Sequence, residues 1–121
     1  MATFTKLHLS SSVSPAGSGI LMTQIISTGD FIHQTGTSAT VIDEVWLYAM
    51  NIQQTPVKLT LAFGGTANRN LVEQTIPGEA GLFLVVPGLI LSGDGTSASD
   101  IKGWASTANV VTITGYVNRI S

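Results

Sequence analysis

The sequence contains no cysteine, and charged side chains make up only 10% of its 121 residues. Without cysteine the chain can form neither a disulfide framework nor a thiolate metal site. Its five Lys and Arg residues are scattered and form no basic stripe of the kind that binds a phosphate backbone. No apolar run approaches the roughly 20 residues that a membrane span requires. We therefore expect no direct contact with nucleic acid and no insertion into a membrane.

The N-terminus also lacks a basic segment followed by a continuous apolar core, which would mark a secretory signal. We therefore expect the chain to fold in the cytoplasm in which it is made. Because charge is scarce, Ser, Thr, Asn and Gln must supply most of the polar surface. Such a surface provides little repulsion between copies, which suits a protein that packs against other subunits.

Residues 40–63 form the most informative stretch, two long apolar segments joined by a short polar turn. In the second segment Val57, Leu59 and Leu61 alternate with polar or small residues, as expected for a half-buried antiparallel strand. The first segment is apolar at both its odd-numbered and its even-numbered positions. A strand of that kind is central in its sheet and is covered on both sides, by its own domain or by a partner.

The remaining sequence predicts more strands and no amphipathic helix. We expect an all-β, single-domain antiparallel β-sandwich of jelly-roll-like topology, with about eight strands. The expected strands outside residues 40–63 are 3–9, 20–27, 31–34, 70–76, 82–86 with a short continuation over 89–91, 101–105 and 109–118. Residues 1–19 are expected to form an N-terminal strand or arm with a flexible linker, and residues 20–121 the sandwich domain. The arm could add a strand to a neighbouring subunit, or it could be an ordinary first strand of the same domain.

The search for catalytic chemistry finds little. The two histidines, His8 and His33, are interpreted as surface residues, because no sequence motif sets either beside a nucleophile. Asp43 and Glu44 are adjacent, so in a strand they face opposite sides and are expected to solvate its start. The loop holding Asp94 and Asp100 has too few carboxylates for a calcium site. We therefore predict no catalytic residue, no metal site and no cofactor, and hence no enzyme.

Apolar side chains offer the best candidates for a binding site. Aromatic residues and Met are enriched at subunit contacts, but they are equally at home in a core beneath a second sheet. Both interpretations stay open for the central-strand residues. The candidate interface residues are Phe4, Leu7, Leu9, Trp46, Tyr48, Met50 and Trp104.

Several segments resemble small β-sandwich virion proteins of tailed bacteriophages. They are residues 33–41, the strand 45–51, the strand 57–61, the segment 83–91 (FLVVPGLIL), and 104–111 running into Gly115-Tyr116-Val117. The resemblance covers residues 31–120. It implies a non-enzymatic structural protein of the virion, assembled in the host bacterial cytoplasm. A head decoration or cement protein is the first expectation, with neck, tail or fibre proteins as alternatives.

The expected partners are further copies of the chain, as a trimer or another cyclic homo-oligomer, and the major capsid protein. Two rival functions remain open. One is a carbohydrate-binding module that uses Trp46 or Trp104 as a stacking platform. The other is a small jelly-roll enzyme, which would need a metal.

Overall fold

A computed structural model describes residues 2–11 and 17–121 of the chain. In these residues the regular structure is almost entirely extended, with a single short 3₁₀ turn at Asn68–Asn70. The strands are β1 (Phe4–His8), β2 (Ile20–Leu21), β3 (Asp30–Gln34), β4 (Ile42–Asn51), β5 (Val57–Phe63), β6 (Leu71–Ile76), β7 (Phe83–Ser92), β8 (Asp100–Ala105) and β9 (Val111–Ile120).

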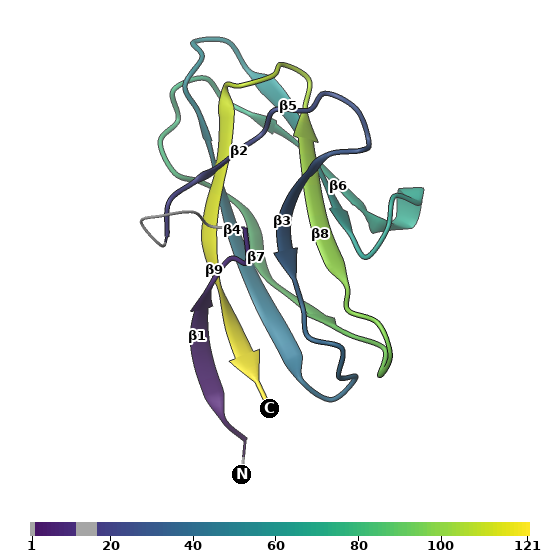
Figure 1. Ribbon diagram of the computed structural model, residues 1–121. Helices are drawn as coiled ribbons and strands as arrows, with labels where there is room; N and C mark the ends of the chain where they lie inside the picture. Colours follow the sequence, from purple (N-terminus) through teal and green to yellow (C-terminus); the bar gives the residue numbers. More distant parts are fainter. Residues whose placement is uncertain (1, 12–16) are drawn as a thin grey trace.

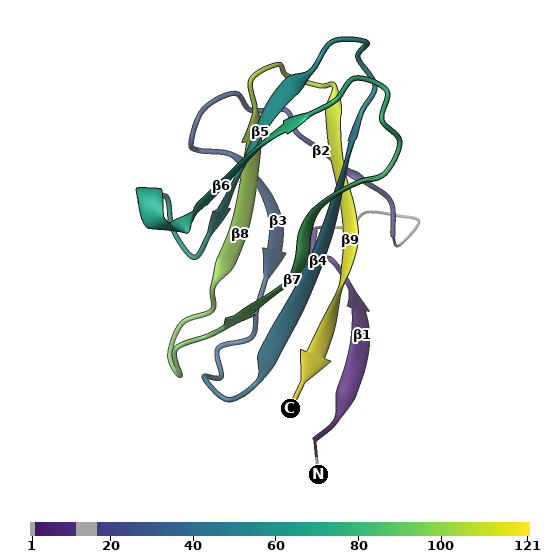
Figure 2. The same ribbon diagram turned by 180° about the vertical axis from the view of Figure 1, so that it is seen from behind.

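The strands form two antiparallel sheets that pack face to face (Figure 1 and, from behind, Figure 2). Sheet A has the order β1-β9-β4-β7, with β2 also pairing with β9, and sheet B has the order β3-β8-β5-β6. Strands pair in a nested series: β5 with β6, β4 with β7, β3 with β8, and both β1 and β2 with β9. This long antiparallel ladder, wrapped into two sheets, is a jelly roll. The expected single-domain, jelly-roll-like sandwich is confirmed.

The core lies between the sheets and follows the period of two that strands impose. In β4 the odd-numbered residues are buried and the even-numbered ones are half-buried. Val45, Leu47 and Ala49 face inward against Leu59 and Leu61 of β5, and none of these five side chains has exposed surface. Thr60 and Ala62, on the outer side of β5, are also buried. The clean alternation predicted for β5 is therefore only partly present.

Two predicted elements differ from the structure. Residues 20–27 were predicted as one strand, but β2 holds Ile20 and Leu21 alone. The Met22 backbone still bonds to Val111, and beyond it the Asp30 carboxylate accepts hydrogen bonds from the backbone N–H groups of Thr23 and Gln24. Pro87-Gly88 was predicted to break a strand, yet β7 runs through it. Within residues 2–11 and 17–121 β7 pairs with β4 alone, and an edge strand tolerates proline because it needs no donor on its outer side.

Candidate functional site

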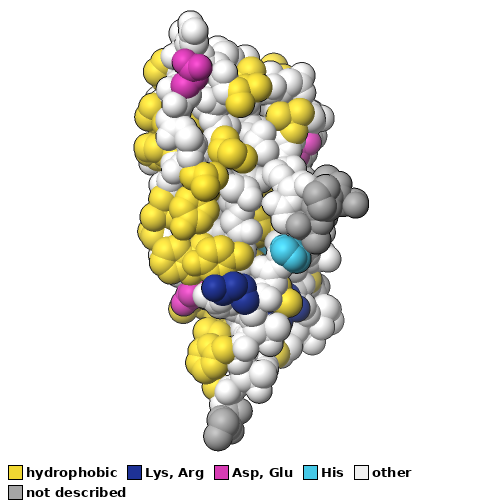
Figure 3. Space-filling view, turned by 90° about the vertical axis from the view of Figure 1, so that its left-hand side faces the viewer, with side chains coloured by type: hydrophobic (Ala, Val, Ile, Leu, Met, Phe, Trp, Pro, Cys, Tyr) yellow, Lys and Arg dark blue, Asp and Glu magenta, His cyan; other side chains and the backbone are white. Residues whose placement is uncertain are grey.

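The outer face of sheet A carries the largest gathering of half-exposed aromatic and apolar side chains. Strand pairing sets the positions on this face, because paired residues share a side of the sheet. Phe4 of β1, Ile120 of β9 and Ile42 of β4 form one row, and Tyr116 of β9 and Trp46 of β4 form another. Tyr48 and Met50 continue the β4 row toward the other end. Figure 3 shows apolar side chains gathered in a band on this side of the molecule.

Trp46 and Tyr116 lie at the centre of the face. Their ring centroids are 6.1 Å apart and their planes differ by 9°. The Lys6 ammonium lies 4.8 Å from the centroid of the Tyr116 ring, within reach of a cation–π attraction. The other side of Trp46 lies against Gly88 of β7, where an added Cβ would come within 3.2 Å of the indole. The contacts thus run without a break from β1 across β9 and β4 to β7.

Polar groups fix this aromatic row in place. The Trp46 indole N–H donates to Glu44 Oε1 over 2.8 Å, and the Asn118 amide donates to the same oxygen over 3.0 Å. The bond from Trp46, with that from Asn118, lowers the pKa of Glu44 below its usual value, so Glu44 is charged at neutral pH. An oriented indole beside a fixed carboxylate makes a preformed surface, which reduces the ordering cost of binding a partner.

The structure brings four of the seven candidate interface residues together and separates the others. Phe4, Trp46, Tyr48 and Met50 share the outer face of sheet A. Leu7 packs against the core, Leu9 is buried in it, and Trp104 lies in β8 on sheet B. The interpretation of the β4 aromatic residues as core was therefore wrong: the side that sheet B covers carries Val45, Leu47 and Ala49. An apolar run on both parities cannot by itself say which side meets the second sheet.

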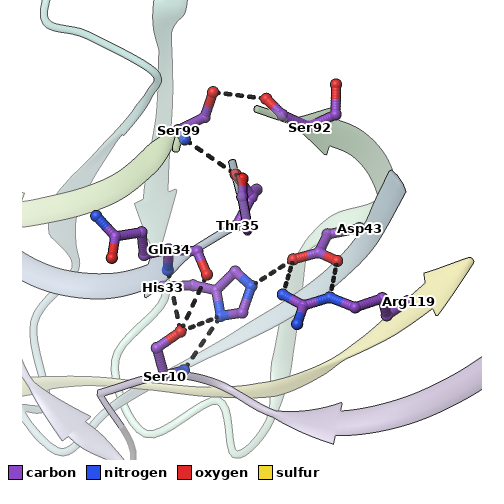
Figure 4. A network of polar contacts seen from close by, with 9 residues as sticks. Ser10, His33, Gln34, Thr35, Asp43, Ser92, Ser99 and Arg119 are labelled. Carbon is purple, nitrogen blue, oxygen red and sulfur yellow. Dashed lines mark hydrogen bonds and ion pairs between the residues drawn. The ribbon is translucent and has the colours of Figure 1, made fainter. Parts of the chain in front are cut away.

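A second cluster, unexpected from the sequence, lies between the sheets (Figure 4). His33 Nδ1 lies 2.8 Å from Ser10 Oγ, and His33 Nε2 lies 2.8 Å from Asp43 Oδ2. Arg119 donates to both oxygens of Asp43, over 2.7 and 2.9 Å. His33 and Asp43 are 2% and 1% exposed. The expectations of a surface histidine and a solvating carboxylate were both wrong, because strand pairing brings together residues that lie 10 to 76 positions apart.

Hydrogen bonds determine the tautomer of His33. The backbone N–H of Ser10 donates to Nδ1 over 3.1 Å, so Nδ1 is an acceptor and Nε2 carries the proton that is donated to Asp43. Burial raises the pKa of Asp43, but the bonds from Arg119 and His33 together outweigh it and hold that pKa below its ordinary value. The bond to Asp43 in turn raises the pKa of Arg119. Asp43 is therefore a buried, fully paired carboxylate.

Ser10, His33 and Asp43 are the residue types of a hydrolase triad, but the ring nitrogens are exchanged: Ser10 meets Nδ1 and Asp43 meets Nε2 of His33. The surroundings also favour a structural clamp. Ser10 Oγ also contacts the Gln34 backbone, donating to the carbonyl over 3.3 Å and accepting from the N–H over 3.1 Å. That N–H therefore points at the hydroxyl itself and not at a position where an oxyanion could form. The cluster ties the segment after β1 to β3, β4 and β9 and so joins both sheets.

Searches of the described residues found neither a cluster of three or more His, Asp or Glu side chains able to hold a metal nor a helix long and apolar enough to cross a membrane. Comparisons with family models, with curated proteins and with solved structures gave no match.

Proposed function

We propose that the chain is a non-enzymatic structural protein of a tailed-phage particle that decorates the head and stabilises it through contacts between subunits. The observation that carries the proposal is the outer face of sheet A. The central strand β4 is apolar on that side too, and no described part of the chain covers Trp46, Tyr48 or Met50 with a second layer. A strand that is apolar on both sides is covered either by its own domain or by a partner. Because the described part of the domain does not cover this side, we infer that a partner does.

The composition and fold agree with this proposal. The chain carries five basic and seven acidic residues, so copies repel one another little at close range. Jelly rolls recur among viral capsid domains, which is an association and not a derivation. The resemblance of residues 31–120 to virion proteins points the same way.

A second apolar surface could hold the protein on the head. Exposed aliphatic side chains lie on loops at one end of the sandwich, the end opposite the two termini (Figure 1). Backbone hydrogen bonds tie these three loops to one another and to the loop between β8 and β9, from Ile52 to Val110, from Glu79 to Asn51 and from Asn109 to Met22. The exposed side chains are Ile25, Ile26, Ile52 and Leu82. This loop end would face the major capsid protein, and many copies on a lattice would provide avidity.

The experiment compares phage particles assembled with and without this chain and then adds the purified protein back. We expect the chain to bind heads in many copies and to raise the temperature at which they release DNA. Ile52→Ser, at a 72% exposed position, should weaken head binding and leave the fold intact. Absence of the chain from intact particles, together with no binding on addition, would overturn the proposal.

The outer face of sheet A also favours one other candidate function, the binding of a carbohydrate. Trp46 and Tyr116 are half-buried there, and Lys6, Glu44 and Asn118 beside them offer polar groups that could bond to sugar hydroxyls. Binding to a glycan array that disappears in Trp46→Ala, but persists in Trp104→Ala, would support this candidate over the structural one.

A further inference from the structure

We propose that the partner on the outer face of sheet A is a second copy of this chain, packed face to face about a two-fold axis that runs along β9. This inference rests on the proposed function in one respect, the use of that face for contact between subunits. It adds the identity of the partner, the symmetry of the contact and the residues that select it.

Two charges on this face carry the argument. Lys6 of β1 and Glu44 of β4 both pair in register with Asn118 of β9, so they stand in one row on either side of the central strand. Neither forms an ion pair among the described residues, in which the ion pairs are Lys58–Glu73, Arg119–Asp43 and His33–Asp43. A lysine and a glutamate that have no ion-pair partner thus lie at equal distances, about 5 Å, from the line of β9.

A two-fold axis in the interface plane and along β9 exchanges the two sides of this row. The rotation does not change a residue's position along the strand direction. Lys6 of one copy therefore lies opposite Glu44 of the other, and Glu44 of the first copy lies opposite Lys6 of the second. An isologous contact requires this reciprocity, in which residue i meets j and j meets i. An unrelated partner has no reason to match two opposite charges arranged symmetrically about one strand.

The rest of the face fits the same contact. Tyr116 lies on the proposed axis, with Trp46 beside it, so the aromatic pair falls at the centre, where the residues that dominate binding energy usually cluster. β4, β7 and β9 are each ten residues long and β1 is five, so the four strands give a face of about 550 Å². That is close to the roughly 800 Å² of accessible surface that each partner buries in a standard interface.

The test is a charge exchange measured by sedimentation equilibrium. Lys6→Glu places two acidic side chains opposite each other and should raise the dimer dissociation constant about tenfold or more. Glu44→Lys should do the same with two basic side chains. The double variant Lys6→Glu/Glu44→Lys restores opposite charges across the axis and should recover most of the lost affinity.

Matched controls separate this effect from local damage. Glu44→Gln keeps an oxygen that can accept from Trp46 and Asn118 but removes the charge, so it should weaken association less than Glu44→Lys. Lys102→Glu reverses a charge in β8, on the other sheet, and should leave association unchanged. Circular dichroism checks that each variant is folded. The inference would be overturned if the double variant self-associates no more tightly than the weaker-binding of the two single variants. It would also be overturned if the wild-type chain stays monomeric at high concentration.

Failure of this inference is distinguishable from failure of the proposed function. A chain that binds phage heads but shows no self-association by sedimentation retains the proposed function and loses the face-to-face dimer. A chain that dimerises with the expected charge dependence but is absent from particles retains the dimer and loses the role in the virion.

Discussion

At the scale of single residues, Asp43 is the most informative side chain in the molecule. It is adjacent to Glu44 in the sequence, yet one carboxylate is buried between the sheets and the other lies on the outer face. Strand alternation predicts that separation. It does not reveal that Asp43 meets His33 and Arg119, because that contact depends on how β3 and β9 are placed around β4.

Removing the charge of Asp43 should be costly. Asp43→Asn removes a buried carboxylate and leaves Arg119, which is 33% exposed, and the buried His33 without a charged acceptor, so we expect a loss of about 2 kcal/mol in the free energy of unfolding. The matched control is Glu73→Gln, which breaks the exposed Lys58–Glu73 pair and should cost less than about 1 kcal/mol. Urea denaturation followed by circular dichroism measures both. Equal losses in the two variants would mean that the buried cluster does not stabilise the fold more than a surface pair.

The same carboxylate should make stability depend on acid. The folded pKa of Asp43 is lowered from 3.8, so the folded state favours the charged form. Its contribution is therefore complete above the unfolded pKa and disappears as the pH falls through the lower, folded value. Glu44 and Asp94 also have lowered pKa values and act in the same direction. Unfolding free energies measured from pH 7 to pH 2 should fall less steeply in Asp43→Asn than in the wild type, and parallel curves would contradict this assignment.

At the scale of elements, the pairing of β4 with β9 holds sheet A together. Gly115 of β9 has a φ of +152°, and an added Cβ would overlap the carbonyl oxygen of Trp46. Gly115→Ala should therefore push the two central strands apart and cost at least about 2 kcal/mol of unfolding free energy. Gly36→Ala is the control, because nothing lies within 4 Å of its added Cβ, and it should change stability by less than about 0.5 kcal/mol. A well-folded Gly115→Ala protein of wild-type stability would refute this account.

The elements also show how far the sequence alone could lead. The long strands β4 and β5 were predicted close to their observed bounds, because two apolar runs separated by a short polar turn are a local feature of the sequence. Residues 22–27 were not, because the capture of backbone N–H groups by Asp30 competes with strand pairing. β7 continues through Pro87 because it lies at a sheet edge, and edge position is a property of the whole topology.

The candidate sites divide in the same way. Aromatic residues and Met in β4 were candidates for a contact surface, but the sequence left open whether they lie in the core. The pairing of β4 in sheet A places Trp46, Tyr48 and Met50 on the outer face. Tyr116 and Lys6 were missed as members of that face, since they join it only through the pairing of β1 and β4 with β9. The Ser10, His33, Asp43 and Arg119 cluster left no motif in the sequence, because its four members come from four different segments.

At the scale of the whole molecule, the two tryptophans report on opposite sheets. Trp46 is on the outer face of sheet A, where the proposed second copy packs, and Trp104 lies in β8 of sheet B. In a Trp104→Phe variant, Trp46 is the remaining indole, and its emission should shift to shorter wavelength as concentration rises and a partner excludes water from it. Adding Lys6→Glu should move that shift to higher concentration, because it weakens the same contact. In Trp46→Phe the emission of Trp104 should not vary with concentration. If the emission wavelength of Trp104 shifts with concentration while that of Trp46 stays constant, the contact between copies lies on sheet B instead.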